Sequence, residues 1–263
     1  MKSLKRYTCK ATLVGLCLAA ANGAYAQIGS INSAVITPRV FNDYPSATGT
    51  YLNAYPGSIT LGESGEFNTG GSGFANKDLW AFSNDGSSAY TLGAGDTSFT
   101  ISANLTVTGA TTVDNEAGWI IPNANGSLPG GDMQFIADPN SGFLGFFGGP
   151  GYFNSGFTYT AGTTVNMTIV YWQTGTTGNM LVSVTDGTTV TSPVQQWAGN
   201  LAGDNLEAYF QLAGIDNSTG PGTSGQAVWS DISISSVPEP STIALLSMGI
   251  VALGGVVSRR RRI

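Results

Sequence analysis

The chain has 263 residues, with 10 basic and 16 acidic side chains, two cysteines and no histidine. Between Gln27 and Ser236 only Arg39 and Lys77 are basic, against 15 acidic residues, which gives this stretch a net charge of −13. Such a surface is repelled by phosphate backbones, which argues against nucleic acid as a partner, and the lack of histidine removes serine–histidine and cysteine–histidine nucleophiles.

The first 26 residues have the pattern of a secretory signal peptide. A basic start (residues 2–10) precedes an apolar run (residues 11–21) that is too short to span a membrane. Ala24 and Ala26 then form a small-x-small cleavage site before Gln27. We therefore expect export through the secretion translocon and cleavage by signal peptidase. Both cysteines lie in this segment, so no disulfide is expected in the exported chain.

Residues 27–236 often alternate apolar and polar side chains with a period of two, which indicates β-strands. The clearest case is TSFTISANLTV (residues 97–107), with Phe99, Ile101 and Leu105 on one face and polar residues on the other. TTVNMTIVYW (residues 163–172) repeats the pattern. Further strand candidates are residues 58–62, 79–83, 118–121, 133–137, 179–190, 206–213 and 227–234.

Glycine-rich turns separate these candidates. TDGTT (residues 185–189) predicts a hairpin turn, and FFGGPGYF (residues 146–153) is typical of a tight turn more than of a phosphate cradle. The pattern of residues 194–210 is ambiguous and is also compatible with one turn of helix. No repeat or proline-rich linker precedes Val237, so we predict one all-β ectodomain, residues 27–236, folded as an antiparallel β-sandwich.

Two segments carry a family resemblance. YTAGTTVNMTIVYWQTGTTGNMLVSVTDG (residues 159–187) resembles the central strands of concanavalin A-like and laminin-G-like jelly rolls, and AVWSDISIS (residues 227–235) resembles their closing strand. The resemblance covers roughly residues 117–235 and implies a jelly-roll-like sandwich. Folds of this class serve glycan binding, adhesion and glycan cleavage, so the resemblance does not choose among them.

Glycoside hydrolysis needs two carboxylates but no histidine, so it remains a distant alternative. Asp114 and Glu116 are two residues apart and would share one face of a strand. The Glu-x-Asp-x-x-Glu cluster typical of jelly-roll glucanases is absent. We therefore predict no catalytic residue and no enzyme activity.

Acidic turns offer the oxygen ligands that Ca²⁺ prefers. Asp114 and Glu116 in DNE, and Asp138 in ADPNSG, are the candidates. Aspartate and asparagine are also the ordinary turn-forming residues, and no EF-hand spacing is present. No cofactor is the first expectation, with Ca²⁺ at these residues as the alternative.

Tryptophan rings are candidate glycan contacts because sugars stack on aromatic faces. In a sandwich without disulfides most tryptophans belong to the core, and Trp80 and Trp119 are expected there. Trp172 is one step out of phase with the apolar face of residues 163–172, and Trp229 alternates opposite the two isoleucines that follow it. We predict Trp172 and Trp229 as glycan contacts on an outward face.

Residues 242–257 are uncharged and mostly apolar. As a helix they would extend about 24 Å, which flanking residues can lengthen toward the roughly 30 Å of a hydrocarbon core. We predict a transmembrane helix at residues 242–257. By the positive-inside rule the basic cluster that follows stays in the cytoplasm, with the body exported. This cluster is Arg259, Arg260, Arg261 and Arg262.

Prolines on both sides of Glu239 keep the strip before the apolar run extended. This strip, the apolar span and the arginine cluster, in that order, resemble the PEP-CTERM sorting signal, here residues 237–263. The resemblance implies recognition by an exosortase in the inner membrane of a Gram-negative bacterium, followed by removal of the tail. The motif residues are Val237, Pro238, Glu239, Pro240, Ser241 and Thr242.

Proteins with this signal are associated with extracellular polysaccharide and biofilm. We therefore expect an exported cell-surface or extracellular-matrix protein that is transiently anchored in the inner membrane and has a structural or adhesive role. A carbohydrate-binding, lectin-like module is the alternative. The expected partners are the exosortase, the translocon, signal peptidase and extracellular polysaccharide.

Overall fold

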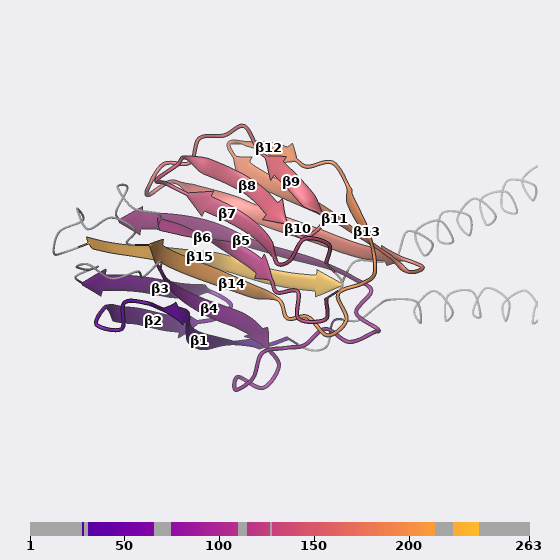
Figure 1. Cartoon of the computed structure of the whole chain (residues 1–263), viewed down its shortest axis with the longest axis horizontal. Coiled ribbons are helices and arrows are strands. Elements are labelled where there is room, and N and C mark those ends of the chain that lie inside the picture. Colours follow the sequence, from indigo (N-terminus) through magenta and orange to yellow (C-terminus); the bar gives the residue numbers. More distant parts are fainter. Residues whose placement is uncertain are drawn as a thin grey trace, which may run out of the picture. The chain divides into compact units, whose positions relative to one another are not determined.

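The computed structural model describes residues 28, 31–65, 75–109, 115–126, 128–213 and 223–236. Within these ranges the chain has 15 strands and no helix, arranged in two antiparallel sheets (Figure 1). Ile28–Ser235 forms one compact unit. The predicted signal peptide, transmembrane helix and arginine cluster lie outside the described residues.

The first sheet has seven strands. Its order is β1 (Ser33–Asn42), β4 (Ala75–Ser83), β14 (Glu207–Ala213), β6 (Asn115–Ile121), β7 (Met133–Asp138), β8 (Phe143–Gly148) and β9 (Gly151–Asn154). The second sheet has eight strands. Its order is β12 (Thr188–Thr191), β11 (Thr177–Asp186), β10 (Thr164–Thr174), β5 (Ser98–Gly109), β15 (Thr223–Ser236), β3 (Ser58–Gly65) and β2 (Thr48–Ala54), with β13 (Gln195–Ala198) also paired to β11.

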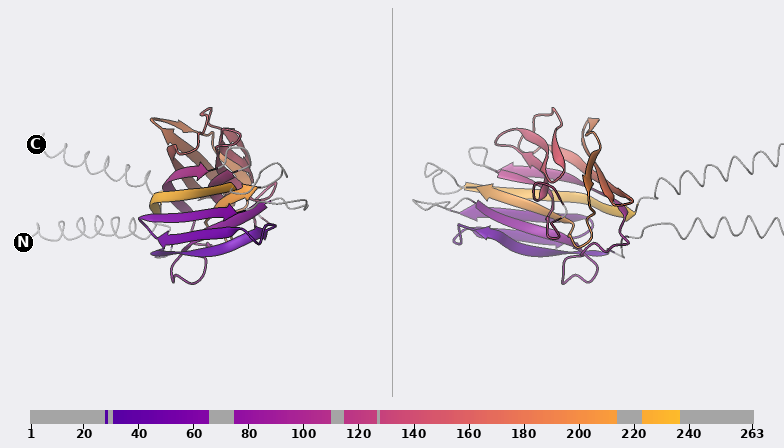
Figure 2. Two further views of the ribbon diagram at one scale, coloured as in Figure 1. Left: turned by 90° about the vertical axis from the view of Figure 1, so that its left-hand side faces the viewer. Right: turned by 45° about the vertical axis from the view of Figure 1, so that its right-hand side comes forward.

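The chain passes repeatedly from one sheet to the other. Strand β14 lies between β4 and β6, and β5 lies between β10 and β15, so neighbours in a sheet are often distant in sequence. The early strands, in indigo and purple, gather at one edge of the sandwich in each view (Figure 2). This connectivity confirms the predicted jelly-roll-like antiparallel sandwich. Residues 195–198, where one helical turn was open, form strand β13.

Strand β10 confirms the predicted phase of its alternation. Its apolar residues on the inner face are at most 1% exposed. Its outward residues hydrogen-bond to those of β5: Asn166 Nδ2 donates to Asn104 Oδ1 (3.1 Å), and the hydroxyls of Thr164 and Thr106 lie 2.7 Å apart. Side-chain hydrogen bonds therefore hold the polar outer face of this sheet together.

An aromatic cluster fills the centre of the sandwich. Trp80 packs edge-to-face against Trp119 (5.5 Å between ring centroids) and against Trp229 (5.9 Å), while Phe82 stacks on Trp119 (5.9 Å). Trp80, Phe82 and Trp119 come from the first sheet and Trp229 from the second. Such pairs each add about 0.5–1.5 kcal/mol beyond the area they bury, so the cluster joins the two sheets.

Trp229 requires a correction to the sequence pattern. The ring was expected on an outward face, but it is 1% exposed in the core. The cause lies at Asp231, whose φ of 51° is left-handed. The consecutive amides of Asp231 and Ile232 donate to the carbonyls of Gly57 and Pro56, whereas successive amides of a regular strand point to opposite sides. Alternation breaks there, so Trp229 and Ile232 both face inward.

A buried polar network joins the two sheets at the edge formed by β1 and β2. The Arg39 guanidinium donates to both Glu63 carboxylate oxygens, each at 2.9 Å. The Arg39 amide and the Tyr51 hydroxyl donate to Asp78 Oδ1, at 3.2 and 3.0 Å. The side chains of Glu63 and Asp78 are fully buried. Burial and the neighbouring Glu63 raise the pKa of Asp78 from 3.8 to about 7.

This shift predicts how stability depends on pH. Because the folded state raises the pKa of Asp78, its proton favours folding fully below about pH 4, and the contribution is lost as the pH rises through about 7. We expect Asp78→Asn, which carries no titrating proton, to flatten the fall in unfolding free energy over this range. Urea unfolding of both proteins at several pH values measures it, and an unchanged slope in Asp78→Asn would contradict the assignment.

Candidate functional site

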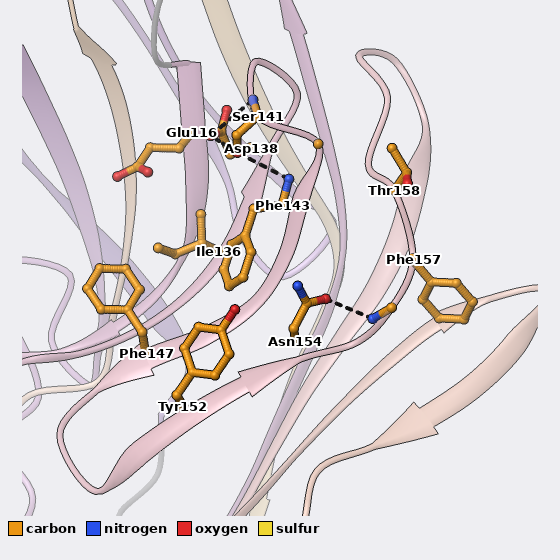
Figure 3. Close-up of a pocket in the computed structure, with 12 residues that line it drawn as sticks. Glu116, Ile136, Asp138, Ser141, Phe143, Phe147, Tyr152, Asn154, Phe157 and Thr158 are labelled. Atoms are coloured by element: carbon orange, nitrogen blue, oxygen red, sulfur yellow. Dashed lines mark hydrogen bonds between the residues drawn. The ribbon is translucent and has the colours of Figure 1, made fainter.

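The outer face of the first sheet contains an open pocket over β6 to β9 (Figure 3). Its volume is about 660 Å³, within the range of sites that hold small ligands. The lining residues are Glu116, Ile136, Asp138, Ser141, Gly142, Phe143, Phe147, Tyr152, Asn154, Gly156, Phe157 and Thr158.

Glycines create the space for this pocket. Ile136 forms its floor and is 3% exposed. In the strand register Ile136 lies between Gly118 on β6 and Gly145 on β8, so neither neighbour adds a side chain to the face. A Cβ at Gly145 would come within 2.1 Å of the Phe153 carbonyl oxygen. Close strand packing therefore requires glycine here, and the depression follows from it.

Aromatic rings form one end of the pocket. Phe147 and Tyr152 are direct cross-strand partners on β8 and β9, and they are 43% and 64% exposed. The Tyr152 ring also lies 6.1 Å from the Phe143 ring, at an interplanar angle of 32°. Rings held this open to solvent provide apolar surface that the protein itself does not cover.

Carboxylates lie at the other end of the pocket (Figure 3). The Asp138 carboxylate accepts hydrogen bonds from the Asn140 amide (2.8 Å) and from the Ser141 hydroxyl, so it stabilises the turn that follows β7. Glu116 Oε1 accepts a hydrogen bond from the Tyr209 hydroxyl (3.2 Å). The structure thus brings together two of the three acidic residues that the sequence singled out.

Lys77 on β4 and Glu116 on β6 are both register partners of Gln211 on β14, which lies between them, so they share one face of the sheet. The Lys77 Nζ sits 4.4 Å from the centroid of the Tyr209 ring and 5.7 Å from that of Phe41, a cation–π arrangement. Burial lowers the pKa of Lys77. The pKa of Tyr209 is raised, first by burial and second by the nearby Glu116 carboxylate. Lys77 is only 6% exposed and does not line the pocket.

The two tryptophans predicted as glycan contacts are not brought together. Trp172 is partly exposed on β10 and lies on the outer side of the second sheet, away from the pocket. Trp229 is in the core. Glycan contact at Trp172 stays a prediction, while Trp229 offers no surface to a ligand.

The calcium hypothesis also stays a prediction. Asp114 lies outside the described residues, whereas Glu116 and Asp138 share the pocket. Within the described ranges, no three histidine, cysteine, aspartate or glutamate residues gather into a group that could hold a metal ion.

The sequence analysis did not predict the exposed rings of Phe147 and Tyr152 at one end of the pocket. The pattern FFGGPGYF predicts a turn, and a turn does join β8 to β9, but the prediction does not include the rings on either side of it. A Gly-Gly-Pro-Gly turn flanked by aromatics pairs Phe147 with Tyr152 across the hairpin. Reading the flanking residues as strands would have placed both rings on one face.

Residues 236–262 match the family model described as the PEP-CTERM protein-sorting motif. The chain carries a PEP-CTERM sorting signal. This match confirms the resemblance seen in the sequence and marks the chain as an exported protein of the kind that an exosortase processes. In the part of the chain that the structure describes, no helix is long and apolar enough to cross a membrane.

No curated protein matches the chain significantly. Among the solved structures that match is an alginate lyase from Pseudomonas aeruginosa, with 12% identity over 74% of this chain and 89% of that chain (TM-score 0.48). An alginate lyase from Corynebacterium sp. matches with 13% identity over 71% of this chain and 81% of that chain (TM-score 0.46). Arcelin-5, a lectin-like defence protein from Phaseolus vulgaris, matches with 8% identity over 82% of this chain and 97% of that chain (TM-score 0.42). Similarity at this level assigns neither activity nor ligand to this chain.

The placement of the two tryptophans can be tested by truncation. We expect Trp229→Ala to lower the unfolding free energy by about 3–5 kcal/mol, because it removes a buried ring from the central cluster. Trp172→Ala should cost far less, because its ring is partly exposed. Urea unfolding compares the two variants, and equal losses would contradict the inward turn of Trp229.

Proposed function

We propose that this exported protein binds extracellular polysaccharide through the pocket over β6 to β9 and acts as an adhesive surface or matrix component, without catalysis. The observation that carries the proposal is the exposed Phe147–Tyr152 pair, which shares an open pocket with carboxylate and amide side chains.

The chemistry of a sugar fits this combination of groups. A pyranose ring has an apolar face of C–H groups and an edge of hydroxyls. The rings of Phe147 and Tyr152 offer a stacking surface for the apolar face of the sugar. Glu116, Asn154 and Thr158 offer hydrogen-bonding groups for its hydroxyls. Ligand sites commonly combine an aromatic surface with a few placed polar groups in this way.

The sorting signal supports a location outside the cell for such a binding module. The PEP-CTERM motif supports processing by an exosortase, with the inner membrane as a transient anchor. A protein released at the surface of a Gram-negative bacterium meets extracellular polysaccharide there. Binding of that polymer would hold the protein in the matrix, which gives the pocket an adhesive role.

Glycoside hydrolysis is the second candidate, because Glu116 and Asp138 flank the paired residues Ala117 and Ala137 on the adjacent strands β6 and β7 and line one pocket. Hydrolysis needs one carboxyl group to donate a proton and the other to attack or activate water. The Asp138 carboxylate is already hydrogen-bonded within its own turn, and Glu116 accepts from Tyr209. Both contacts favour binding over catalysis.

The binding proposal predicts that Tyr152→Ala lowers affinity for polysaccharide about tenfold, because it removes the most exposed ring of the pocket. Trp172→Ala, which removes a partly exposed ring from the other sheet, is the matched control and should bind like the unchanged protein. Affinity electrophoresis of the exported protein in gels containing neutral polysaccharides measures the effect.

Loss of binding in Trp172→Ala but not in Tyr152→Ala would move the site to the second sheet and contradict the proposal. New reducing ends, released by the protein and abolished in Glu116→Gln, would instead support the hydrolase. Unaltered polymer supports a binding role.

The sorting signal generates a separate prediction. Exosortase processing should leave a surface form whose intact mass lacks Arg259–Arg262. Replacing Pro238 and Pro240 with alanine should retain the full-length tail in the membrane, because the extended recognition strip is lost. A full-length mass for the unchanged protein in cells that contain exosortase would overturn this assignment.

A further inference from the structure

We infer that the pocket over β6 to β9 takes a polysaccharide without acidic groups, whose hydroxyls donate hydrogen bonds to the carboxylates of the pocket. This inference rests on the proposed function and adds the chemical class of the ligand. It separates neutral polymers from the uronic-acid and sulfated polymers that are also common in extracellular matrices.

The first observation is the sign of the charge in the pocket. Its two charged side chains, Glu116 and Asp138, project from the same face of adjacent strands. An ionised carboxylate accepts hydrogen bonds and cannot donate them. A hydroxyl can satisfy such a group, whereas a ligand carboxylate or sulfate would bring a like charge beside it without a proton to share.

The second observation is that, among the residues that the structure describes, no cation lines the pocket, although the buried Lys77 interacts electrostatically with Glu116. Between Gln27 and Ser236 the sequence has only two basic residues, Arg39 and Lys77. Arg39 is bonded to Glu63 at the edge formed by β1 and β2. Lys77 is buried over the Tyr209 ring and lies outside the lining. Recognition of an acidic sugar draws on arginine or lysine, and neither belongs to the described lining of the pocket.

The third observation is that the other polar groups of the pocket are uncharged. Asn154 Oδ1 accepts from the Gly156 amide at 2.8 Å, and its amide nitrogen lies on the side of Phe143 (Figure 3). Thr158 and the Tyr152 hydroxyl are further neutral groups of the lining. Amide and hydroxyl groups donate and accept, as the hydroxyls of a neutral sugar do. The lining therefore suits a hydroxyl-rich, uncharged chain.

The test uses paired polymers that share a backbone and differ in whether their substituents are charged: dextran with carboxymethyl-dextran, hydroxyethylcellulose with carboxymethylcellulose, and methyl-esterified polygalacturonate with polygalacturonate. We expect the exported protein to bind the uncharged member of at least one pair about tenfold or more tightly at low salt. The preference should shrink from about 0.01 M to about 1 M salt, since the screening length falls from about 30 Å to about 3 Å.

Glu116→Gln provides the matched variant, because glutamine keeps the shape of the side chain and can still accept from the Tyr209 hydroxyl. We expect it to bind the uncharged polymer more weakly, because an amide oxygen is a weaker acceptor than a carboxylate, and to discriminate less against the charged partner than the unchanged protein does. Circular dichroism spectra that match those of the unchanged protein establish that the variant is folded.

The outcomes distinguish an error in the ligand class from an error in the binding function. Equal or tighter binding of the charged polymers, lost in Tyr152→Ala, would overturn the ligand class while the binding function stands. Binding to the charged polymers that Tyr152→Ala does not affect would overturn both the site and the ligand class. No binding to any polymer of the set would count against the proposed function itself.

Discussion

The aromatic cluster of Trp80, Trp119 and Trp229 is the contact on which the rest of the structure depends. Both cysteines precede Gln27, so no disulfide can hold the exported body together. The two sheets are joined instead by rings from β4, β6 and β15, and the Trp119 indole donates to the Met167 carbonyl on the opposite sheet at 3.2 Å. Because these inner-face contacts hold the two sheets together, the fold does not depend on the side chains of the outer faces in the same way.

The outer faces of the two sheets differ in how their side chains are arranged. On the second sheet, hydroxyl and amide side chains bond to one another from strand to strand, which satisfies them internally. On the first sheet, glycines at positions 118 and 145 lower the surface beside Ile136, and aromatic rings stand open next to carboxylates. The proposed binding role follows from this difference, because the first sheet combines a hollow with exposed rings and polar groups.

The sequence predicted the fold well where its alternation was regular. Strands β5 and β10 have the expected inner and outer residues, because every second residue is apolar and no irregularity interrupts them. The alternation gave the wrong face for Trp229, because the left-handed backbone of Asp231 shifts the alternation. The local sequence gives no sign of this irregularity. The pocket was missed for another reason. Its residues come from β6, β7, β8 and β9 and the loops beside them, and their meeting depends on strand register, which composition does not reveal.

Sugar binding on the outer face of the first sheet can be tested directly by an NMR titration of the exported protein with a neutral oligosaccharide, following backbone amides and tryptophan indole signals. We expect shifts at Phe147, Tyr152 and Asn154, with the Trp172 indole unchanged. Shifts centred on Trp172 and β10, with none over β8 and β9, would contradict it.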